Sequence, residues 1–203
     1  MTFGKRLFDI VLALLLGALL LLPILVIAAL ILLRDGRPVL YLSERMKTPE
    51  QGFQLWKFRT MTVVASDSGV SGGDKSARIT PIGAWLRRYR LDELPQLWNI
   101  LRGDISFVGP RPPLRRYVEM CPDLYRRVLR ARPGVTGLAT LVFHKTEERL
   151  LAPCRTPEET EAVYLRRCVP VKGRLDLIYA ANRSVCYDAR LMAETVLRVL
   201  RRS

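Results

Sequence analysis

One uninterrupted apolar stretch constrains the fold of this chain more than any other feature. No charged residue occurs from Ile10 to Leu33, and as one helix this segment would be roughly 36 Å long, enough to cross a hydrocarbon core about 30 Å thick. A spanning helix is therefore the default expectation. Two observations favour instead a helix that bends and returns to the same face: Pro23 near the middle, and basic residues at both ends rather than one. The flanking basic residues are Lys5, Arg6, Arg34 and Arg37.

The residues alone leave these two topologies open. A cleavable signal peptide is a third option, but no small-residue cleavage site follows the stretch. In the bent form, all four basic flanks would meet the same anionic leaflet. In either form we expect an anchor over residues 1–36 and a second domain over residues 37–203.

Composition narrows the class of partner. The 203 residues are 49% hydrophobic, which suits one domain with an appendage, and 33 basic residues against 19 acidic ones give a net charge of +14. Such a charge favours nucleic acid, anionic lipid or phosphorylated substrates. The apolar stretch selects lipid, and the aromatic residues lie at core-like spacings rather than as a platform for stacking bases. We therefore expect no nucleic-acid partner.

Beyond the apolar stretch, the patterns predict an α+β domain that is mainly helical. Two strands are expected at residues 39–43 and 53–61 with a turn at 48–52. Thr80-Pro81 predicts a helix start, and a second helix is expected to begin at Asp92 and to end at Gly103. Further helices are expected within 114–132 and 157–167 and from 188 onward, the last one amphipathic and basic, with Leu191, Thr195, Val196, Val199 and Leu200 on one face.

An acidic pair among basic residues is the main chemical signal. Asp92-Glu93 follows the run Arg87-Arg88-Tyr89-Arg90 and precedes the rigid segment Gly109-Pro110-Arg111-Pro112-Pro113. A helix N-terminus and nearby arginines would favour the ionised carboxylate, the form that a nucleophile needs. Taken alone, the pair is better explained as a helix cap, and only its neighbours favour a catalytic role.

A second cationic signal lies in the expected strand at 53–61. Alternation places Lys57 and Arg59 on one face and Trp56 and Phe58 on the other. The plain alternative is a solvated strand face.

Longer motifs identify a family. The run LDELPQLWN at 91–99, followed by LRGD at 101–104, Ser106 and VGPRP at 108–112, resembles bacterial sugar transferases, the monotopic phosphoglycosyl transferases. The segments KRLFD at 5–9, KFRTM at 57–61 and RPGVTGLA at 132–139 are similar to the same family. The resemblance implies a membrane enzyme that moves a sugar 1-phosphate from a UDP-sugar to a polyprenol phosphate, releases UMP and begins glycan assembly on the cytoplasmic face of the bacterial inner membrane.

The resemblance also favours the bent, re-entrant helix with its kink at Pro23, although Leu22 stands where relatives often carry a small polar residue. It implies an aspartyl-phosphosugar intermediate on Asp92 and Mg²⁺ held by Asp92 and Glu93. The phosphate-binding side chains that it implies are Lys57, Arg59, Arg88 and Arg111. Pro112, Gly134 and Thr136 would line the nucleotide end of the site, and Asp176 would approach it.

The remaining signals are weak. The four cysteines have no metal-ligand spacing and read as reduced thiols, and His144, the one histidine, reads as a polar loop or sheet residue. The Gly/Ser-rich segment 66–76 lacks a nucleotide-binding spacing and reads as a loop. A non-enzymatic membrane adaptor would also explain the anchor and the charge, but not the acidic pair. The sequence indicates neither which sugar is carried nor the oligomeric state.

Overall fold

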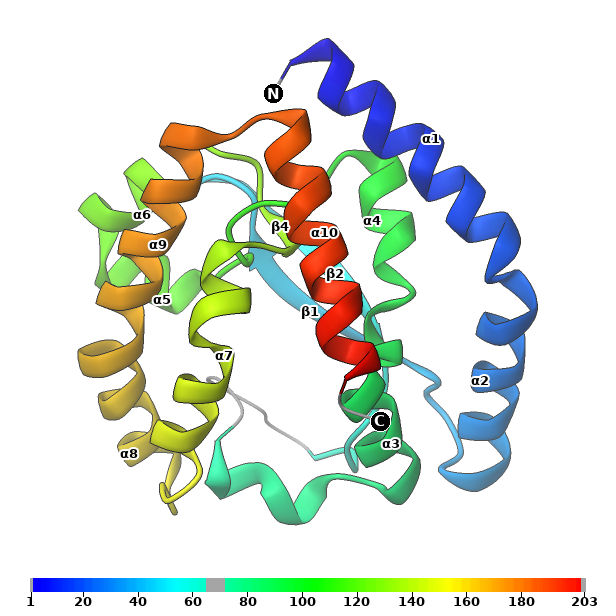
Figure 1. Ribbon diagram of the computed structural model, residues 1–203. Helices are drawn as coiled ribbons and strands as arrows, with labels where there is room; N and C mark the ends of the chain where they lie inside the picture. Colours follow the sequence, from blue (N-terminus) through cyan, green and yellow to red (C-terminus); the bar gives the residue numbers. More distant parts are fainter. Residues whose placement is uncertain (1, 65–71, 202–203) are drawn as a thin grey trace.

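The computed structural model describes residues 2–64 and 72–201, and its N-terminal stretch is a bent pair of helices. Helices α1 (Phe3–Leu19) and α2 (Leu21–Arg34) run along one edge of the molecule (Figure 1) and meet at an angle of 61°. Among the described residues, no single helix has both the length and the apolar character to cross a membrane, whereas this pair together does by length and composition.

The bend lies at Leu20 rather than at Pro23 itself. Pro23 is the third residue of α2, a position in the first turn that proline tolerates. Its missing N–H would have bonded the carbonyl of Leu19, four residues earlier, and its ring crowds that carbonyl. The break therefore falls one turn before the proline, which is where these two effects act.

The helix pair has an inner and an outer face. On the inner face, Ala13 packs against Leu55 and Ile100, while Ile31 packs against Phe58 and Leu86. The outer face exposes large aliphatic side chains along both helices, among them Leu14, Leu15, Leu19, Leu22, Leu25 and Leu33. An aliphatic face of this extent is unusual for a protein surface in contact with water.

The basic residues before the apolar stretch make hydrogen bonds to other parts of the protein. Arg6 donates to the carbonyl oxygens of Ile100 at 2.6 Å and Leu101 at 2.8 Å, near the C-terminal end of a neighbouring helix. Asp9, which is 1% exposed, accepts a hydrogen bond from the Ser106 hydroxyl at 3.1 Å. The KRLFD segment thus fastens α1 to the rest of the molecule.

The predicted hairpin is present, with shifted ends. Strands β1 (Leu40–Met46) and β2 (Gly52–Phe58) are antiparallel, with Leu40 opposite Phe58 and Met46 opposite Gly52. A second, parallel pair was not predicted: β3 (Ser106–Val108) beside β4 (Gly134–Thr136). A Cβ atom on Gly134 would lie 2.2 Å from the backbone nitrogen of Gly109, so glycine is required at the start of β4, where it passes close to the residue after β3.

The other elements are helical, as predicted for most of the chain. They are a 3₁₀ helix Gly73–Arg78, α3 (Pro81–Tyr89), α4 (Gln96–Arg102), α5 (Arg115–Met120), α6 (Pro122–Val128), α7 (Leu138–Leu151), α8 (Pro157–Val163), a π-helical turn Tyr164–Cys168, α9 (Val169–Asn182) and α10 (Val185–Leu200). A core of Tyr117, Val128, Phe143, Tyr164 and Cys168 forms on the side of the molecule away from α1 and α2 (Figure 1). The mainly helical α+β class is confirmed.

Several local predictions need correction. Helix α4 begins at Gln96, not at Asp92, because Leu91–Glu93 forms a separate 3₁₀ turn and Pro95 occupies the N-cap of α4. In α10, Leu191 is buried whereas Val196 is 57% exposed, so residues assigned to one face differ in burial. The expected positions of Val199 and Leu200 on the apolar face, and residues 66–71 of the Gly/Ser-rich segment, lie outside what the structure describes. All four cysteines are free thiols.

Candidate active site

The acidic pair lies in the connection between α3 and α4. Thr80 caps α3 by accepting a hydrogen bond from the Gly83 nitrogen at 3.0 Å, with Pro81 at the first helical position as predicted. The helix ends at Arg90, whose φ of 58° turns the chain into the 3₁₀ turn Leu91–Glu93. Asp92 and Glu93 are both 8% exposed as a result. The turn therefore places two carboxyl groups inside the protein.

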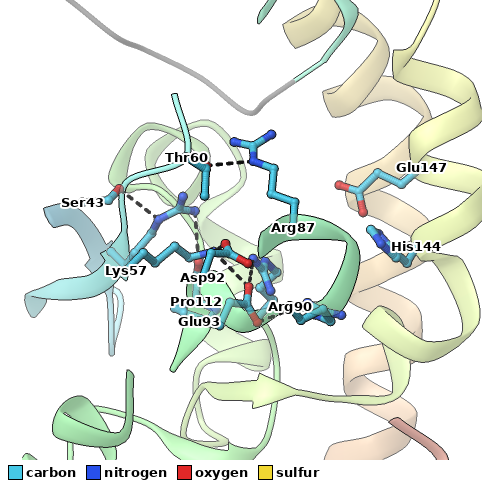
Figure 2. A network of polar contacts seen from close by, with 12 residues as sticks. Ser43, Lys57, Thr60, Arg87, Arg90, Asp92, Glu93, Pro112, His144 and Glu147 are labelled. Carbon is cyan, nitrogen blue, oxygen red and sulfur yellow. Dashed lines mark hydrogen bonds and ion pairs between the residues drawn. The ribbon is translucent and has the colours of Figure 1, made fainter. Parts of the chain in front are cut away.

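Glu93 holds the surrounding cations. Its Oε1 atom accepts from Lys57 Nζ and from Arg111 Nη2, both at 2.9 Å, and its Oε2 atom accepts from Arg90 Nη2 at 3.3 Å (Figure 2). Burial would raise the pKa of Glu93, but the charges of these three cations outweigh it and hold the pKa well below its usual value. Glu93 is thus a fixed negative charge that organises a set of cations.

Asp92 is in a different state. Its Oδ2 atom lies 3.8 Å from Lys57 Nζ, beyond hydrogen-bond distance. Burial raises the pKa of Asp92, the neighbouring charge of Glu93 raises it further, and the cations Lys57, Arg111 and Arg87 offset this only in part. The arginines thus stabilise the ionised form of Asp92 as expected, but burial and the charge of Glu93 outweigh them, so the pKa of Asp92 is raised rather than lowered.

Lys57 and Arg111 are brought together as predicted. Burial lowers the pKa of the Lys57 ammonium, while the charge of Glu93 opposes that shift. The charge of Glu93 raises the pKa of Arg111, so this guanidinium stays charged. Lys57 comes from β2, before the acidic pair in the sequence, and Arg111 comes from the segment after β3, so residues on both sides of the pair in the sequence supply its cations.

The residues predicted for the nucleotide end hold the segment that precedes Arg111. The Gly134 nitrogen donates to the Pro110 carbonyl at 2.8 Å, and the Gly109 nitrogen donates to the Thr136 carbonyl at 2.9 Å. Pro112 is buried, and its carbonyl accepts from Arg45 at 3.4 Å. The hydroxyl of Thr136 lies 2.8 Å from that of Thr195 in α10. The β3–β4 pair thus fixes the backbone of the segment that carries Arg111.

Two predicted phosphate ligands are not part of this cluster. Arg59 donates to the carbonyl oxygens of Asp35 at 2.6 Å, Gly36 at 2.9 Å and Arg37 at 3.1 Å, because β2 ends at Phe58 and the strand alternation stops there. Arg88 is exposed, with its guanidinium 5.6 Å from the ring centre of Tyr89.

Arg87 and Arg90 take the inner positions that were predicted for Arg88. Arg87 Nε donates to the Thr60 hydroxyl at 2.9 Å, and its charge lowers the pKa of Asp92, although burial outweighs it. Arg90 is bound to Glu93. The choice among three arginines depends on the phase of a nine-residue helix and on one left-handed residue at its end, neither of which the run of arginines reveals.

Asp176 belongs to a different buried region. It lies in α9, where burial raises the pKa of its carboxyl to about 7 and the Lys172 ammonium offsets this only in part. In the described parts of the chain, Glu93 forms its ion pairs with Lys57, Arg90 and Arg111, and Asp176 takes no part in these pairs. Its predicted approach to the site stays a prediction.

Helix α7 contributes two residues that sequence reasoning missed. His144 and Glu147 project from α7 toward the side where Arg87 and Asp92 lie (Figure 2). Glu93 is the main cause of the raised pKa of Arg111, burial opposes it, and the charge of Glu147 adds a smaller increase. Glu147 accepts from Lys172 Nζ at 2.9 Å. His144 lies in a helix rather than in a loop or sheet, and its Nε2 atom lies 3.3 Å from Glu148 Oε1. Its spacing of three from Glu147, which puts both side chains on one helix face, was the signal available in the sequence.

The site suits a magnesium ion held chiefly by substrate. Within the described parts of the chain, no group of three or more histidine, cysteine or acidic side chains could hold a metal. Both oxygens of Glu93 already accept from cations, which leaves Asp92 as the better protein ligand. Mg²⁺ typically uses one or two carboxylates and completes its shell with phosphate oxygens and water, so this donor set fits that ion.

Comparison with known proteins gives consistent matches. The family model described as bacterial sugar transferase matches residues 1–202. The uncharacterized sugar transferase EpsL of Bacillus subtilis is 33% identical over 196 residues, covering 97% of this chain and 87% of that protein. The exopolysaccharide production protein PSS of Rhizobium leguminosarum bv. phaseoli is 37% identical over 209 residues, covering 98% of this chain and 96% of that protein.

A third relative is longer. The UDP-N-acetylgalactosamine-undecaprenyl-phosphate N-acetylgalactosaminephosphotransferase of Aeromonas hydrophila is 36% identical over 179 residues, which is 85% of this chain. The match spans only 38% of that protein.

Proposed function

This chain belongs to the bacterial sugar transferase family, and from that premise we propose that it transfers a sugar 1-phosphate from a UDP-sugar to a membrane polyprenol phosphate. UMP is released, and the lipid-linked sugar begins the assembly of a glycan such as an exopolysaccharide. The Aeromonas relative is named for a UDP-sugar donor and an undecaprenyl-phosphate acceptor, and the Rhizobium relative for exopolysaccharide production. These names support the substrate class of the proposal.

The observation that carries the proposal is that Glu93 and Asp92 differ in how closely they contact the surrounding cations. Glu93 binds Lys57, Arg111 and Arg90, whereas Asp92 lies beside these cations with no ion pair shorter than 3.8 Å among the described residues. A carboxylate beside organised cations suits attack on a diphosphate, since phosphoryl transfer depends on alignment and charge stabilisation.

The proposed reaction has two displacements at the same phosphorus. A carboxylate oxygen of Asp92 attacks the β-phosphorus of the UDP-sugar, and the bond from that phosphorus to the bridging oxygen breaks. UMP leaves with the electron pair, and Asp92 carries the phosphosugar as an acyl phosphate. A phosphate oxygen of the polyprenol phosphate then attacks the phosphorus, which releases the Asp92 carboxylate and forms a polyprenyl diphosphate sugar.

The cations serve the diphosphate during both steps. Arg111 presents a planar fork that can bind two phosphate oxygens, and Lys57 adds a charge beside the attacking carboxylate. We propose Mg²⁺ as the cofactor, held by Asp92 and donor phosphates, with Glu93 positioning the cations around it. When bound, the ion would neutralise charge on the diphosphate.

The helix pair α1–α2 is proposed to enter the membrane and return to the same side. Its bend of 61° and its aliphatic outer face support a re-entrant anchor that keeps the catalytic part at the cytoplasmic face. Phosphorylated donor and lipid acceptor would then meet at the membrane surface.

The direct test is UMP release from a panel of UDP-sugars by purified protein with a short-chain polyprenol phosphate. One donor is expected to give rapid, magnesium-dependent release, and Asp92→Asn, which keeps the shape of the side chain, is expected to abolish it. With the donor alone, intact-protein mass should rise by one phosphosugar in the wild type only. A wild-type protein inactive with every donor would favour the non-enzymatic adaptor, and an active Asp92→Asn variant would remove Asp92 from the mechanism.

A further inference from the structure

Two polar side chains from distant parts of the chain meet at the backbone carbonyl of Val108, and a third, Asp188, binds both of them. The Tyr179 hydroxyl in α9 lies 3.1 Å from this oxygen, and Lys5 Nζ in the first turn of α1 donates to it at 3.3 Å. Both side chains also bind Asp188 in α10, Lys5 as an ion pair and Tyr179 at 2.7 Å. The single hydrogen of the Tyr179 hydroxyl is shared between Asp188 and the Val108 oxygen, whereas the Lys5 ammonium has a separate hydrogen for each. Asp188 therefore orients both groups that lie against the Val108 oxygen.

This network is buried in the protein. Tyr179 is 1% exposed and Asp188 is 3% exposed. A buried ion pair costs desolvation and is a weak source of stability, so its value in a protein often lies in fixing one specific arrangement.

Val108 is the last residue of β3, three residues before Arg111. The opposite side of this segment is held by β4 through the bonds from Gly109 to Thr136 and from Gly134 to Pro110. With the Val108 carbonyl held as well, the chain between β3 and Arg111 is fixed from both sides. Arg111 then reaches Glu93 at 2.9 Å.

We propose that Asp188 is a positioning residue for Arg111. Through Lys5 and Tyr179 it fixes the Val108 carbonyl, and thereby the place at which the Arg111 guanidinium meets the diphosphate of the donor. Because Lys5 belongs to α1, the same contact makes the geometry of Arg111 depend on how the helix pair α1–α2 is seated. The catalytic part of this inference rests on the proposed transferase function.

The kinetic test compares Asp188→Asn and Tyr179→Phe with Glu194→Gln. Glu194 lies in the same helix and forms an exposed ion pair with Arg190 at 2.9 Å, so it is a matched control. Both network variants are expected to lower kcat about tenfold with little change in KM, since a displaced guanidinium loses contacts made in the transition state. Glu194→Gln is expected to keep wild-type kinetics.

A double variant separates positioning of Arg111 from general damage. In an Arg111→Lys background, Asp188→Asn is expected to lower kcat less than about twofold further, because the group that it positions is already lost. If the losses of the two single variants multiply, Asp188 acts independently of Arg111 and the proposal is overturned.

Hydrogen–deuterium exchange tests the coupling without any turnover. Residues 106–111 are expected to exchange faster in Asp188→Asn and Tyr179→Phe, with no change in α3, and Glu194→Gln should match the wild type throughout. If Asp188→Asn loosens the whole protein, Tyr179→Phe, which keeps the ring, decides. Unchanged exchange at 106–111 in Tyr179→Phe overturns the proposal, whereas a wild-type protein that never releases UMP refutes only the transferase function.

Discussion

Asp92 and Glu93 are adjacent in sequence, yet their carboxyl groups have opposite surroundings. The pKa of Asp92 is raised by burial and by Glu93, while cations hold the pKa of Glu93 low. An acidic nucleophile works only when ionised, so activity should be lost as the pH falls through the raised pKa of Asp92. With Asp92 as the proposed nucleophile, the acid limb of the rate profile is expected above the ordinary range of an aspartate.

Glu93→Gln is expected to move this acid limb to lower pH while reducing the maximal rate. The change removes a negative neighbour and releases Lys57 and Arg111 to interact with Asp92, and both effects lower the pKa of Asp92. Single-turnover UMP release measured across pH for both proteins tests this. An acid limb at the same pH in both would show that Glu93 does not control the ionisation of Asp92.

Arg111→Lys is expected to lower kcat on the order of a hundredfold, because a lysine keeps the charge but loses the planar fork. Arg115→Lys is the matched control, since Arg115 forms an exposed ion pair with Glu44 at 2.7 Å. Steady-state kinetics of the two variants distinguish them. Equal, near-wild-type rates would mean that Arg111 is structural.

The sequence could identify the acidic pair, Lys57 and Arg111, because each of them falls within a motif of the family. It could not choose among Arg87, Arg88 and Arg90, since burial depends on where α3 ends. It also misplaced Arg59, because strand alternation applies only as far as the strand extends, and β2 stops one residue earlier. These errors arise where a side chain's direction is set by an element boundary.

At the scale of elements, the bend between α1 and α2 is the feature on which the proposed re-entrant topology depends. Pro23→Ala restores an N–H for the Leu19 carbonyl and favours one straight helix, long enough to cross the bilayer. The N-terminus should then reach the periplasmic side, and activity should fall because Lys5 and Arg6 are drawn from their partners.

Labelling of a Thr2→Cys substitution in intact vesicles measures this change. A Cys186→Ser background removes the exposed native thiol. The thiol should react from the cytoplasmic side in the otherwise wild-type protein and from the periplasmic side with Pro23→Ala. Periplasmic labelling without Pro23→Ala would exclude the re-entrant anchor and leave the chemistry at Asp92 unaffected.

Elements differed in how well the sequence predicted them. Helix α3 was clear because Thr80 and Pro81 are local signals. The pair β3–β4 was not, because each strand has three residues and exists only through pairing between Ser106 and Gly134, distant along the chain. Local patterns carry no record of such a partner.

At the scale of the whole molecule, Asp176 should make stability depend on pH. Burial raises the pKa of its carboxyl to about 7 in the folded state, above that of an unfolded aspartate. Between these two values the unfolded state has released the proton and the folded state still holds it, so the free energy of unfolding falls as pH rises. One such group contributes a slope of up to about 1.4 kcal/mol per pH unit.

Asp176→Asn should therefore flatten this dependence between about pH 4 and pH 7 and stabilise the protein at neutral pH. Thermal denaturation in detergent across that range is the measurement. Asp123→Asn, at a side chain that is 92% exposed, should leave the profile as in the wild type. A wild-type profile in Asp176→Asn would mean that the carboxyl ionises alike in both states.

Arg59 fastens the linker between α2 and β1 by its three bonds to residues 35–37, and Thr80 at the start of α3 adds a bond to Asp35 at 2.7 Å. Because this linker is held by hydrogen bonds, the part of the chain that follows it has little freedom to move relative to α1 and α2. In the proposed reaction the donor would arrive from bulk water in three dimensions, whereas the lipid acceptor would have to reach the enzyme by lateral diffusion in two. The acceptor's effective concentration is its mole fraction in the bilayer, so adding inert lipid at constant total acceptor should slow the reaction by surface dilution alone.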